Sequence, residues 1–143
     1  MKDKYFLDTN IIIYSFASDN ESKQAIARRL IAQALGYQSG CISYQVVQEF
    51  LNVALRKFNR PLSSSDAQKY ITATLEPLCE IYSSIPLYHK AIEIKERWQF
   101  SFYDSLIISA ALTANCTVLY SEDMQHEQKI EDLVIINPFV MSE

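Results

Sequence analysis

The sequence predicts an α/β domain in which a short parallel sheet is flanked by helices on both faces. Short apolar runs, typical of buried parallel strands, alternate along the chain with longer segments of helical periodicity. This alternation favours right-handed crossovers that cover both faces of the sheet. The length of 143 residues and the hydrophobic content of 49% suit one domain with its own core. We therefore expect a single three-layer domain over residues 1–143.

Five apolar runs are predicted to be the strands. Each is only a few residues long and rich in β-branched, aromatic or other apolar side chains. The first run is Tyr5-Phe6-Leu7, and Asp8 closes it. In chain order the predicted strands are residues 5–8, 41–43, 81–85, 117–120 and 133–136.

Five segments repeat apolar residues every three or four positions and are predicted to be helices. Gly36 is expected to end the first and Pro61 to bar continuation of the second. Ser65 and Gln68 have the spacing of a capping box at the start of the third. The last is apolar nearly all round, as a helix buried on several sides would be. The predicted helices are residues 21–36, 44–59, 66–76, 87–99 and 104–114.

Composition limits the classes of function. A net charge of −4 and a pI of about 5.2 argue against a protein that coats nucleic acid through a broad basic surface. They do not exclude a nuclease, because bound metal ions present positive charge to phosphate. Cys41, Cys79 and Cys116 form no zinc pattern, so we expect buried free thiols. With no apolar stretch long enough for a membrane span, we expect a cytoplasmic location.

Four carboxylates stand near strand ends or helix starts: Asp8, Glu49, Asp104 and Asp123. Asp8 closes the first strand, Glu49 lies in the second turn of the helix after the second strand, Asp104 opens a helix, and Asp123 follows the strand 117–120. Ligands of open α/β sheets bind at the carboxyl ends of the strands, so these distant residues can converge there. Converging carboxylates repel one another unless a hard divalent cation neutralises them. The placement therefore predicts a metal site.

Each acid also has an ordinary explanation when it is considered alone. Asp104 lies three residues after Ser101 and suits the first turn of a helix, where the dipole favours an acid. Asp123 suits a loop or helix cap, and Glu49 a solvated helix surface. Asp8 is harder to explain, because a carboxylate at the end of a buried strand is costly unless donors or a cation compensate it.

The local sequence around these acids resembles the PIN-domain ribonucleases, and among them the VapC-type toxins of toxin–antitoxin pairs. The resemblance covers nearly the whole chain, and its specificity lies in the order and spacing of several short motifs. They are Leu7-Asp8-Thr9-Asn10-Ile11, Ser43 with Glu49, Phe102-Tyr103-Asp104-Ser105-Leu106-Ile107, and Ser121-Glu122-Asp123-Met124 followed by Asn137-Pro138-Phe139.

The resemblance implies a short parallel sheet flanked by helices, with acids at one end that bind Mg²⁺ or Mn²⁺. Its catalytic and metal-binding quartet falls on Asp8, Glu49, Asp104 and Asp123, and the positions of Asn10 and Ser121 imply hydrogen-bonding support. It also implies an RNA substrate, a homodimer and an antitoxin partner encoded beside the toxin. The RNA target and the number of metal ions are left open.

Rival functions are weighed on the same residues. A phosphatase with an aspartate nucleophile needs a second acid two residues after Asp8, where this chain has Asn10. The other alternative is a catalytically inactive PIN-like RNA- or protein-binding module, which an incomplete quartet would mark. The intact quartet favours the nuclease.

Some side chains carry weaker predictions. Arg56, Lys57 and Arg60 gather at one helix end, where they either offset the helix dipole or contact RNA phosphate. His126 is expected to be a plain surface residue. Most of the four aromatic residues near the site in sequence order are expected to pack in the core. They are Tyr14, Tyr44, Phe102 and Tyr103.

Overall fold

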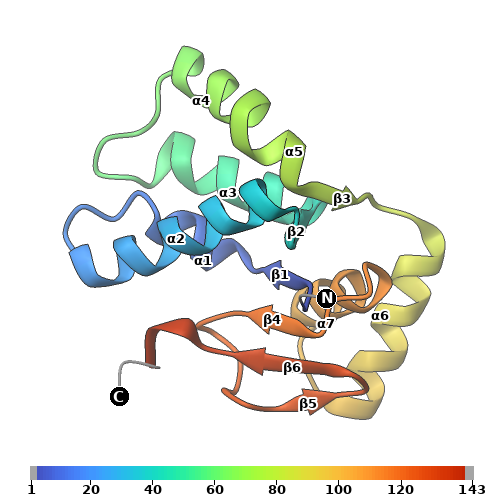
Figure 1. Cartoon of the computed structure of the whole chain (residues 1–143). Coiled ribbons are helices and arrows are strands. Elements are labelled where there is room, and N and C mark those ends of the chain that lie inside the picture. Colours follow the sequence, from blue (N-terminus) through green and yellow to red (C-terminus); the bar gives the residue numbers. More distant parts are fainter. Residues whose placement is uncertain (1–2, 141–143) are drawn as a thin grey trace.

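Strand β1 (Tyr5–Leu7) lies inside a six-stranded sheet with the order β3-β2-β1-β4-β6-β5. The computed structural model, drawn in Figure 1, describes residues 3–140. All neighbouring strands run parallel except β5 and β6, which form an antiparallel pair at one edge. The remaining strands are β2 (Gly40–Ser43), β3 (Cys79–Ile81), β4 (Val118–Tyr120), β5 (Lys129–Ile130) and β6 (Leu133–Ile136).

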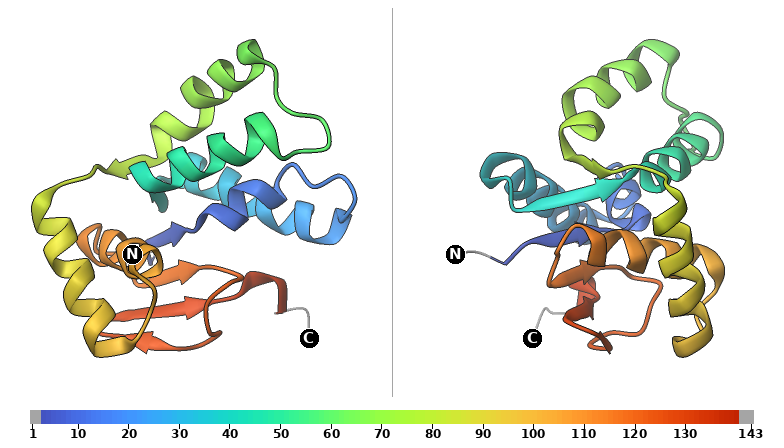
Figure 2. Two further views of the ribbon diagram at one scale, coloured as in Figure 1. Left: turned by 180° about the vertical axis from the view of Figure 1, so that it is seen from behind. Right: turned by 90° about the vertical axis from the view of Figure 1, so that its right-hand side faces the viewer.

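Helices connect β1 to β2, β2 to β3 and β3 to β4, and they lie on both sides of the sheet (Figures 1 and 2). The chain first proceeds from β1 outward to β3 and then returns past β1 to β4. Because such crossovers are right-handed, this reversal puts the helices before β4 on the opposite face from those before β3. The predicted α/β fold is confirmed. The helices are α1 (Thr9–Tyr14), α2 (Glu21–Tyr37), α3 (Tyr44–Arg56), α4 (Ser64–Tyr70), a π-helical turn (Ile71–Leu75), α5 (Glu76–Leu78), α6 (Ile85–Trp98), α7 (Phe102–Thr113) and a 3₁₀ turn (Pro138–Val140).

The third strand was predicted too late in the chain, at 81–85 rather than at β3. Ser84 is the N-cap of α6, with its hydroxyl accepting the backbone N–H of Leu87, and Pro86 occupies the first turn. Both residues favour a helix start, so residues 82–85 do not continue the strand. The short helix α1 was not predicted, because its β-branched isoleucines are typical of a strand. The edge strand β5 was not predicted, because it has only two residues.

Two predicted helix signals also differ from the structure. Ser63, not Ser65, caps α4 by accepting the N–H of Asp66, while Gln68 contacts Ser64 instead. Helix α2 continues through Gly36 and ends where Gln38 adopts a left-handed conformation with φ of 53°. Gly36 therefore lies close to the end of the helix but does not end it.

The core gathers both faces of the sheet, and α7 is buried along most of its length, as predicted. Cys41 and Cys116 are buried free thiols with their Sγ atoms 3.6 Å apart. The prediction was wrong for Cys79, which is only half-buried because β3 is an edge strand. Within residues 3–140, every helix is too short or too polar to cross a membrane.

Gly40 provides a test of this packing. A Cβ added there would lie 2.6 Å from both Ala34 Cβ and Tyr5 Cε1. Gly40→Ala should therefore cost about 1–3 kcal/mol of unfolding free energy through overpacking. Gly36→Ala is the matched control, since nothing lies within 4 Å and alanine favours the helix by about 0.5–1 kcal/mol. Thermal unfolding should move in opposite directions for the two variants, and equal melting temperatures would contradict this packing.

Candidate metal centre

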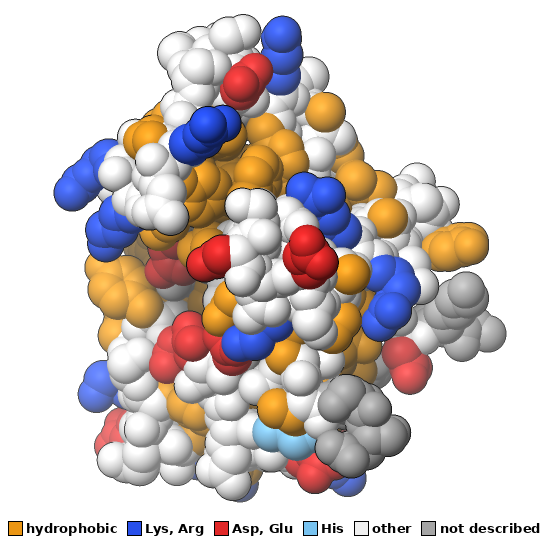
Figure 3. All heavy atoms as spheres, turned by 90° about the vertical axis from the view of Figure 1, so that its left-hand side faces the viewer, with side chains coloured by type: hydrophobic (Ala, Val, Ile, Leu, Met, Phe, Trp, Pro, Cys, Tyr) orange, Lys and Arg blue, Asp and Glu red, His pale blue; other side chains and the backbone are white. Residues whose placement is uncertain are grey.

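The candidate site lies where β1 and β4 end side by side. Asp8 follows β1 and donates its N–H to the carbonyl oxygen of Tyr120, the last residue of β4, at 3.0 Å. The chain leaves these two strands in opposite directions, which makes this edge the expected place for a ligand. Figure 3 looks onto this edge and shows acidic side chains gathered near its middle.

A cavity of about 360 Å³ at this edge is lined by all four predicted acids. They come from separate elements: Asp8 from the end of β1, Glu49 from α3, Asp104 from α7, and Asp123 from the loop after β4. Predicted Asn10 also lines it, whereas Ser121 is buried behind it. The other lining residues are Thr9, Ile13, Gln45, Asn52, Val53, Tyr103 and Ile107.

Asp8 is a buried carboxylate, with only 6% of its surface exposed. Its Oδ1 accepts the N–H of Thr9 at 2.7 Å, which starts α1, and its Oδ2 accepts the hydroxyl of Ser121 at 2.8 Å. Burial raises the pKa of Asp8 to about 7, helped by the charges of Glu49 and Asp104 and opposed by these two hydrogen bonds. The two hydrogen bonds therefore do not fully offset the cost of burying the negative charge of Asp8.

Asp104 lies in the first turn of α7, but Ser101 caps that helix by accepting the N–H of Asp104 at 3.1 Å. The half-buried carboxylate of Asp104 lines the cavity. Burial raises its pKa, as do the charges of Asp123 and Glu49, while a hydrogen bond with Ser101 lowers it. The position thus suits a helix start and also adds charge to the cavity.

Glu49 is held in the cavity by neighbours on two helices. Its Oε1 accepts the hydroxyl of Thr9 at 2.6 Å, and its Oε2 accepts the amide of Gln45, one turn earlier on α3, at 3.0 Å. The Gln45 amide also donates to the carbonyl oxygen of Tyr103 on α7. A solvated surface glutamate would lack these contacts.

Asn10 and Ser121, predicted as supports, both contact acids. The Asn10 amide donates to Asp123 Oδ2 at 3.1 Å, and its Oδ1 accepts the N–H of Glu122 at 3.2 Å. Ser121 donates to Asp8 while its Oγ accepts the N–H of Asp123 at 3.3 Å. These contacts tie the loop after β4 to the start of α1.

The donor set suits a hard cation. All the charged groups that line the cavity are carboxylates, and no Lys, Arg or His is among its lining residues within 3–140. Mg²⁺ and Mn²⁺ prefer such oxygen donors. As the side chains stand, no three His, Cys, Asp or Glu residues of this range are close enough to enclose an ion. To hold an ion, these side chains would have to move together around it, and the ion would offset their repulsion.

Several site residues were not predicted. Thr9 and Gln45 were overlooked although one lies inside the first motif and the other has helical i,i+4 spacing to Glu49. The expectation of core packing was wrong for Tyr44 and Tyr103, which are 45% and 65% exposed. His126 is half-buried, and its Nδ1 accepts the N–H of Asn137 at 2.9 Å, a structural contact.

The buried acid predicts an unusual pH dependence of stability. The folded protein holds more protons than the unfolded chain between the ordinary pKa of 3.8 and about 7, so Asp8 lowers stability as pH rises through that window. Asp8→Asn should therefore stabilise the metal-free protein at pH 8 by on the order of 2–4 kcal/mol. Melting temperatures in a chelator at pH 5 and 8 measure this. Exposed Asp132→Asn is the control, and an unchanged or lower melting temperature for Asp8→Asn at pH 8 would contradict the burial argument.

Comparison with solved structures finds the same fold in bacterial toxins. A toxin–antitoxin complex from Klebsiella pneumoniae matches with a TM-score of 0.66 at 18% identity, covering 94% of this chain and 98% of that chain. VapBC2 from Rickettsia felis, bound to a promoter DNA fragment, matches with a TM-score of 0.62 at 19% identity, covering 92% and 96%. VapC20 of Mycobacterium tuberculosis, a toxin that cleaves the sarcin–ricin loop, matches with a TM-score of 0.59 at 17% identity, covering 84% and 90%. At these identities the similarity shows the fold alone.

Comparison at the level of sequence gives the family. No curated protein matches this chain significantly. The model of the PIN domain family matches residues 5–131, a span that contains all four acids and both of the supporting polar residues. The chain therefore belongs to the PIN domain family.

Proposed function

We propose that this chain is a metal-dependent endoribonuclease that hydrolyses RNA phosphodiester bonds as the toxin of a type II toxin–antitoxin pair. The observation that carries the proposal is the cavity of about 360 Å³ in which carboxylates from four separate elements meet without a cationic side chain among the lining residues. The PIN family match over residues 5–131 supports it. The proposal treats residues 1–143 as one nuclease domain.

The residues that would hold Mg²⁺ or Mn²⁺ are Asp8, Asp104, Asp123 and Glu49. A bound divalent ion lowers the pKa of a coordinated water and polarises a phosphoryl oxygen, which is the chemistry that phosphodiester hydrolysis needs. The protein supplies orientation: Ser121 and Thr9 fix Asp8, Gln45 fixes Glu49, and Asn10 fixes Asp123. These hydrogen bonds keep carboxylates that repel one another directed into one cavity.

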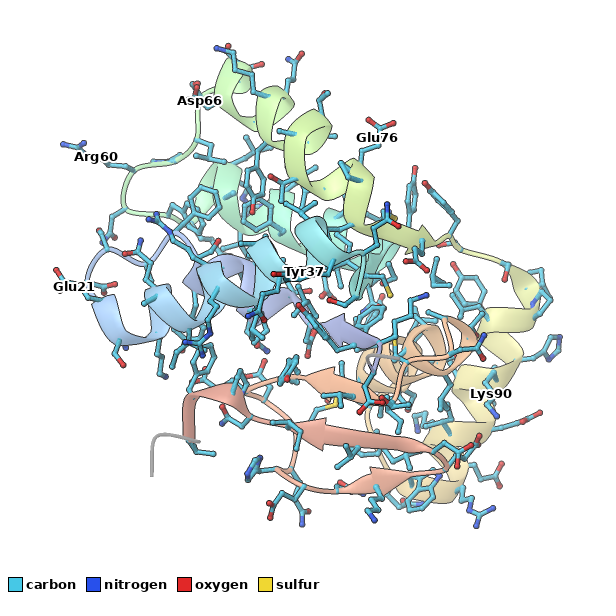
Figure 4. The ribbon with its side chains drawn as sticks, in the orientation of Figure 1. Glu21, Tyr37, Arg60, Asp66, Glu76 and Lys90 are labelled. Carbon is cyan, nitrogen blue, oxygen red and sulfur yellow. The ribbon has the colours of Figure 1, made fainter. Side chains whose placement is uncertain are left out.

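Basic side chains beside the acids mark the path that we propose for the RNA strand. A second cavity of about 460 Å³ shares Ile13 with the acid cavity and is lined by Lys57 and Arg60. Figure 3 shows basic side chains on the same face as the acidic group, and Figure 4 labels Arg60, which projects from that side. Cations beside a metal site suit the phosphates that flank the cleaved bond.

The proposed partners are an antitoxin and a second copy of the chain. The support for an antitoxin is the fold shared with a Klebsiella pneumoniae toxin–antitoxin complex and with VapBC2 of Rickettsia felis. The homodimer rests on the family resemblance alone. The RNA target is left open, because loop details decide it.

The central test is cleavage with and without metal. Single-stranded RNA should be cut in Mg²⁺ or Mn²⁺ and left intact in a chelator. Asp8→Asn and Asp104→Asn should each lower the rate by at least about 100-fold with the fold preserved, because each removes one charged oxygen ligand. Asp132→Asn, at an exposed turn, is the matched control and should cleave normally.

Two outcomes would count against the enzyme. Undiminished cleavage by the Asp8→Asn, Asp104→Asn double variant would show that the activity comes from elsewhere. No rise in melting temperature with Mn²⁺ would favour the inactive RNA- or protein-binding module, since ligand at 100 times its dissociation constant adds about 2.7 kcal/mol.

Tyr103 is expected to hold a base next to the cleaved bond. Its ring is 65% exposed at the acid cavity, and Phe102 contacts it edge-on at 5.5 Å. Tyr103→Ala should weaken binding of a short RNA about tenfold by loss of stacking, and Tyr103→Phe should not. Tyr37→Ala, an equally exposed tyrosine at the far end of α2 (Figure 4), is the control. Equal RNA dissociation constants in a chelator for all three variants would contradict the role.

A further inference from the structure

Two acids stand next to each other in the loop after β4, and only one lines the acid cavity. Asp123 lines the cavity, whereas Glu122 does not. The two acids are neighbours in sequence, so the conformation of the loop decides which of their carboxylates faces the cavity. The Asp123 carboxylate accepts the side-chain amide of Asn10 at 3.1 Å, on the exposed side of the cavity. The direction of Asp123 therefore depends on how the backbone of residues 121–123 is held.

Glu122 is bound by two side chains from the first two helices. Its Oε1 accepts the hydroxyl of Tyr14 on α1 at 2.6 Å, and its Oε2 accepts the ammonium of Lys23 on α2 in a short ion pair. The side chains of Lys23 and Glu122 are only 30% and 24% exposed. The pair is thus better shielded from solvent than an ordinary surface ion pair.

Aromatic rings enclose the same ammonium group. Lys23 Nζ lies 4.7 Å from the ring centroid of Tyr14 and 5.3 Å from that of Phe139. The two rings contact each other edge-on, with centroids 4.9 Å apart. Cation–π contacts and packing fix Lys23 in addition to its charge pair. Tyr14, Lys23, Glu122 and Phe139 thus form one cluster of mutual contacts that holds the loop.

We infer that Lys23 and Tyr14 are positioning residues that hold Glu122 away from the acid cavity and thereby direct Asp123 into it. With Glu122 anchored on one side, its N–H remains on Asn10 Oδ1 and the next N–H on Ser121 Oγ. The Asn10 amide nitrogen also donates to Asp123, and the Ser121 hydroxyl donates to Asp8. The role of Asp123 as a metal ligand rests on the proposed function, whereas the orientation of the loop does not.

Charge explains why a cation is needed at this place. Without Lys23, Glu122 would be one more uncompensated carboxylate beside a group that already repels itself. It would then turn toward solvent or toward the cavity, and either movement rotates the adjacent Asp123. Lys23 thus keeps the loop in one state and decides which of two neighbouring acids faces the cavity.

The test compares Lys23→Met with Lys90→Met. Lys90, labelled on α6 in Figure 4, forms a more exposed ion pair with Glu131 at 3.0 Å, and it does not line the acid cavity. Lys23→Met should lower the affinity for Mn²⁺, measured by calorimetry, by about tenfold, as other residues that orient metal ligands do. In metal-free protein it should also speed hydrogen exchange of the Glu122 and Asp123 amides. Lys90→Met should change neither quantity.

Two further variants separate positioning from general stability. Lys23→Arg should keep Mn²⁺ affinity near that of the unaltered protein. Adding Glu122→Gln to Lys23→Met should restore most of the loss, because the unpaired charge is gone while Tyr14 can still donate to the amide oxygen. Lys23→Met that matches Lys90→Met in both measurements, or a double variant weaker than Lys23→Met, would overturn the inference.

The same experiment separates this inference from the proposed function. An unaltered protein that binds Mn²⁺ but cleaves no RNA would end the proposed function and leave the Mn²⁺ comparison valid. An unaltered protein that binds no Mn²⁺ would leave the amide exchange of the metal-free variants to decide the inference.

Discussion

The mutual repulsion of carboxylates that gather at the ends of β1 and β4, with Asp8 buried among them, is the constraint on which the site depends. The repulsion follows from the strand order, because β1 and β4 are distant in sequence but adjacent in the sheet. Asp8 and the loop of Asp123 therefore lie at one edge. Helices α3 and α7 add Glu49 and Asp104. Burial, and after it the charges of the neighbouring acids, raises the pKa values of Asp8 and Asp104, and this is the cost of gathering them. We propose that a bound cation offsets this cost.

The residues around the repelling acids are hydrogen-bond donors without charge, and the nearby cation Lys23 pairs with an acid outside the cavity. Threonine, serine, glutamine and asparagine side chains orient the acids without neutralising them. The lysine on α2 instead neutralises Glu122, the acid that does not line the cavity. Positive charge is thereby excluded from the place where a metal ion would bind and used where an acid must be kept away. This division links the packing of α1 and α2 to the chemistry at the sheet edge.

Most of the fold and the four acids that line the cavity were predicted from the sequence, but the details of local geometry were not. Period and apolar runs located the parallel strands, because buried strands have few alternatives. The sequence did not indicate the shift of β3, where the cap at Ser84 decides, or the end of α2 at Gln38. Contacts of Thr9, Gln45 and Lys23 were not foreseen either, because hydrogen bonds between distant elements leave no periodic pattern.

The most direct test of the central claim is to locate a bound metal. Crystals grown with Mn²⁺ should show at least one anomalous peak in the acid cavity, with carboxylate oxygens of Asp8 and Asp104 as ligands at about 2.0–2.3 Å. Glu122 should still contact Lys23 in that structure. A cavity without a peak at millimolar Mn²⁺, or a peak that none of the four acids contacts, would contradict the account.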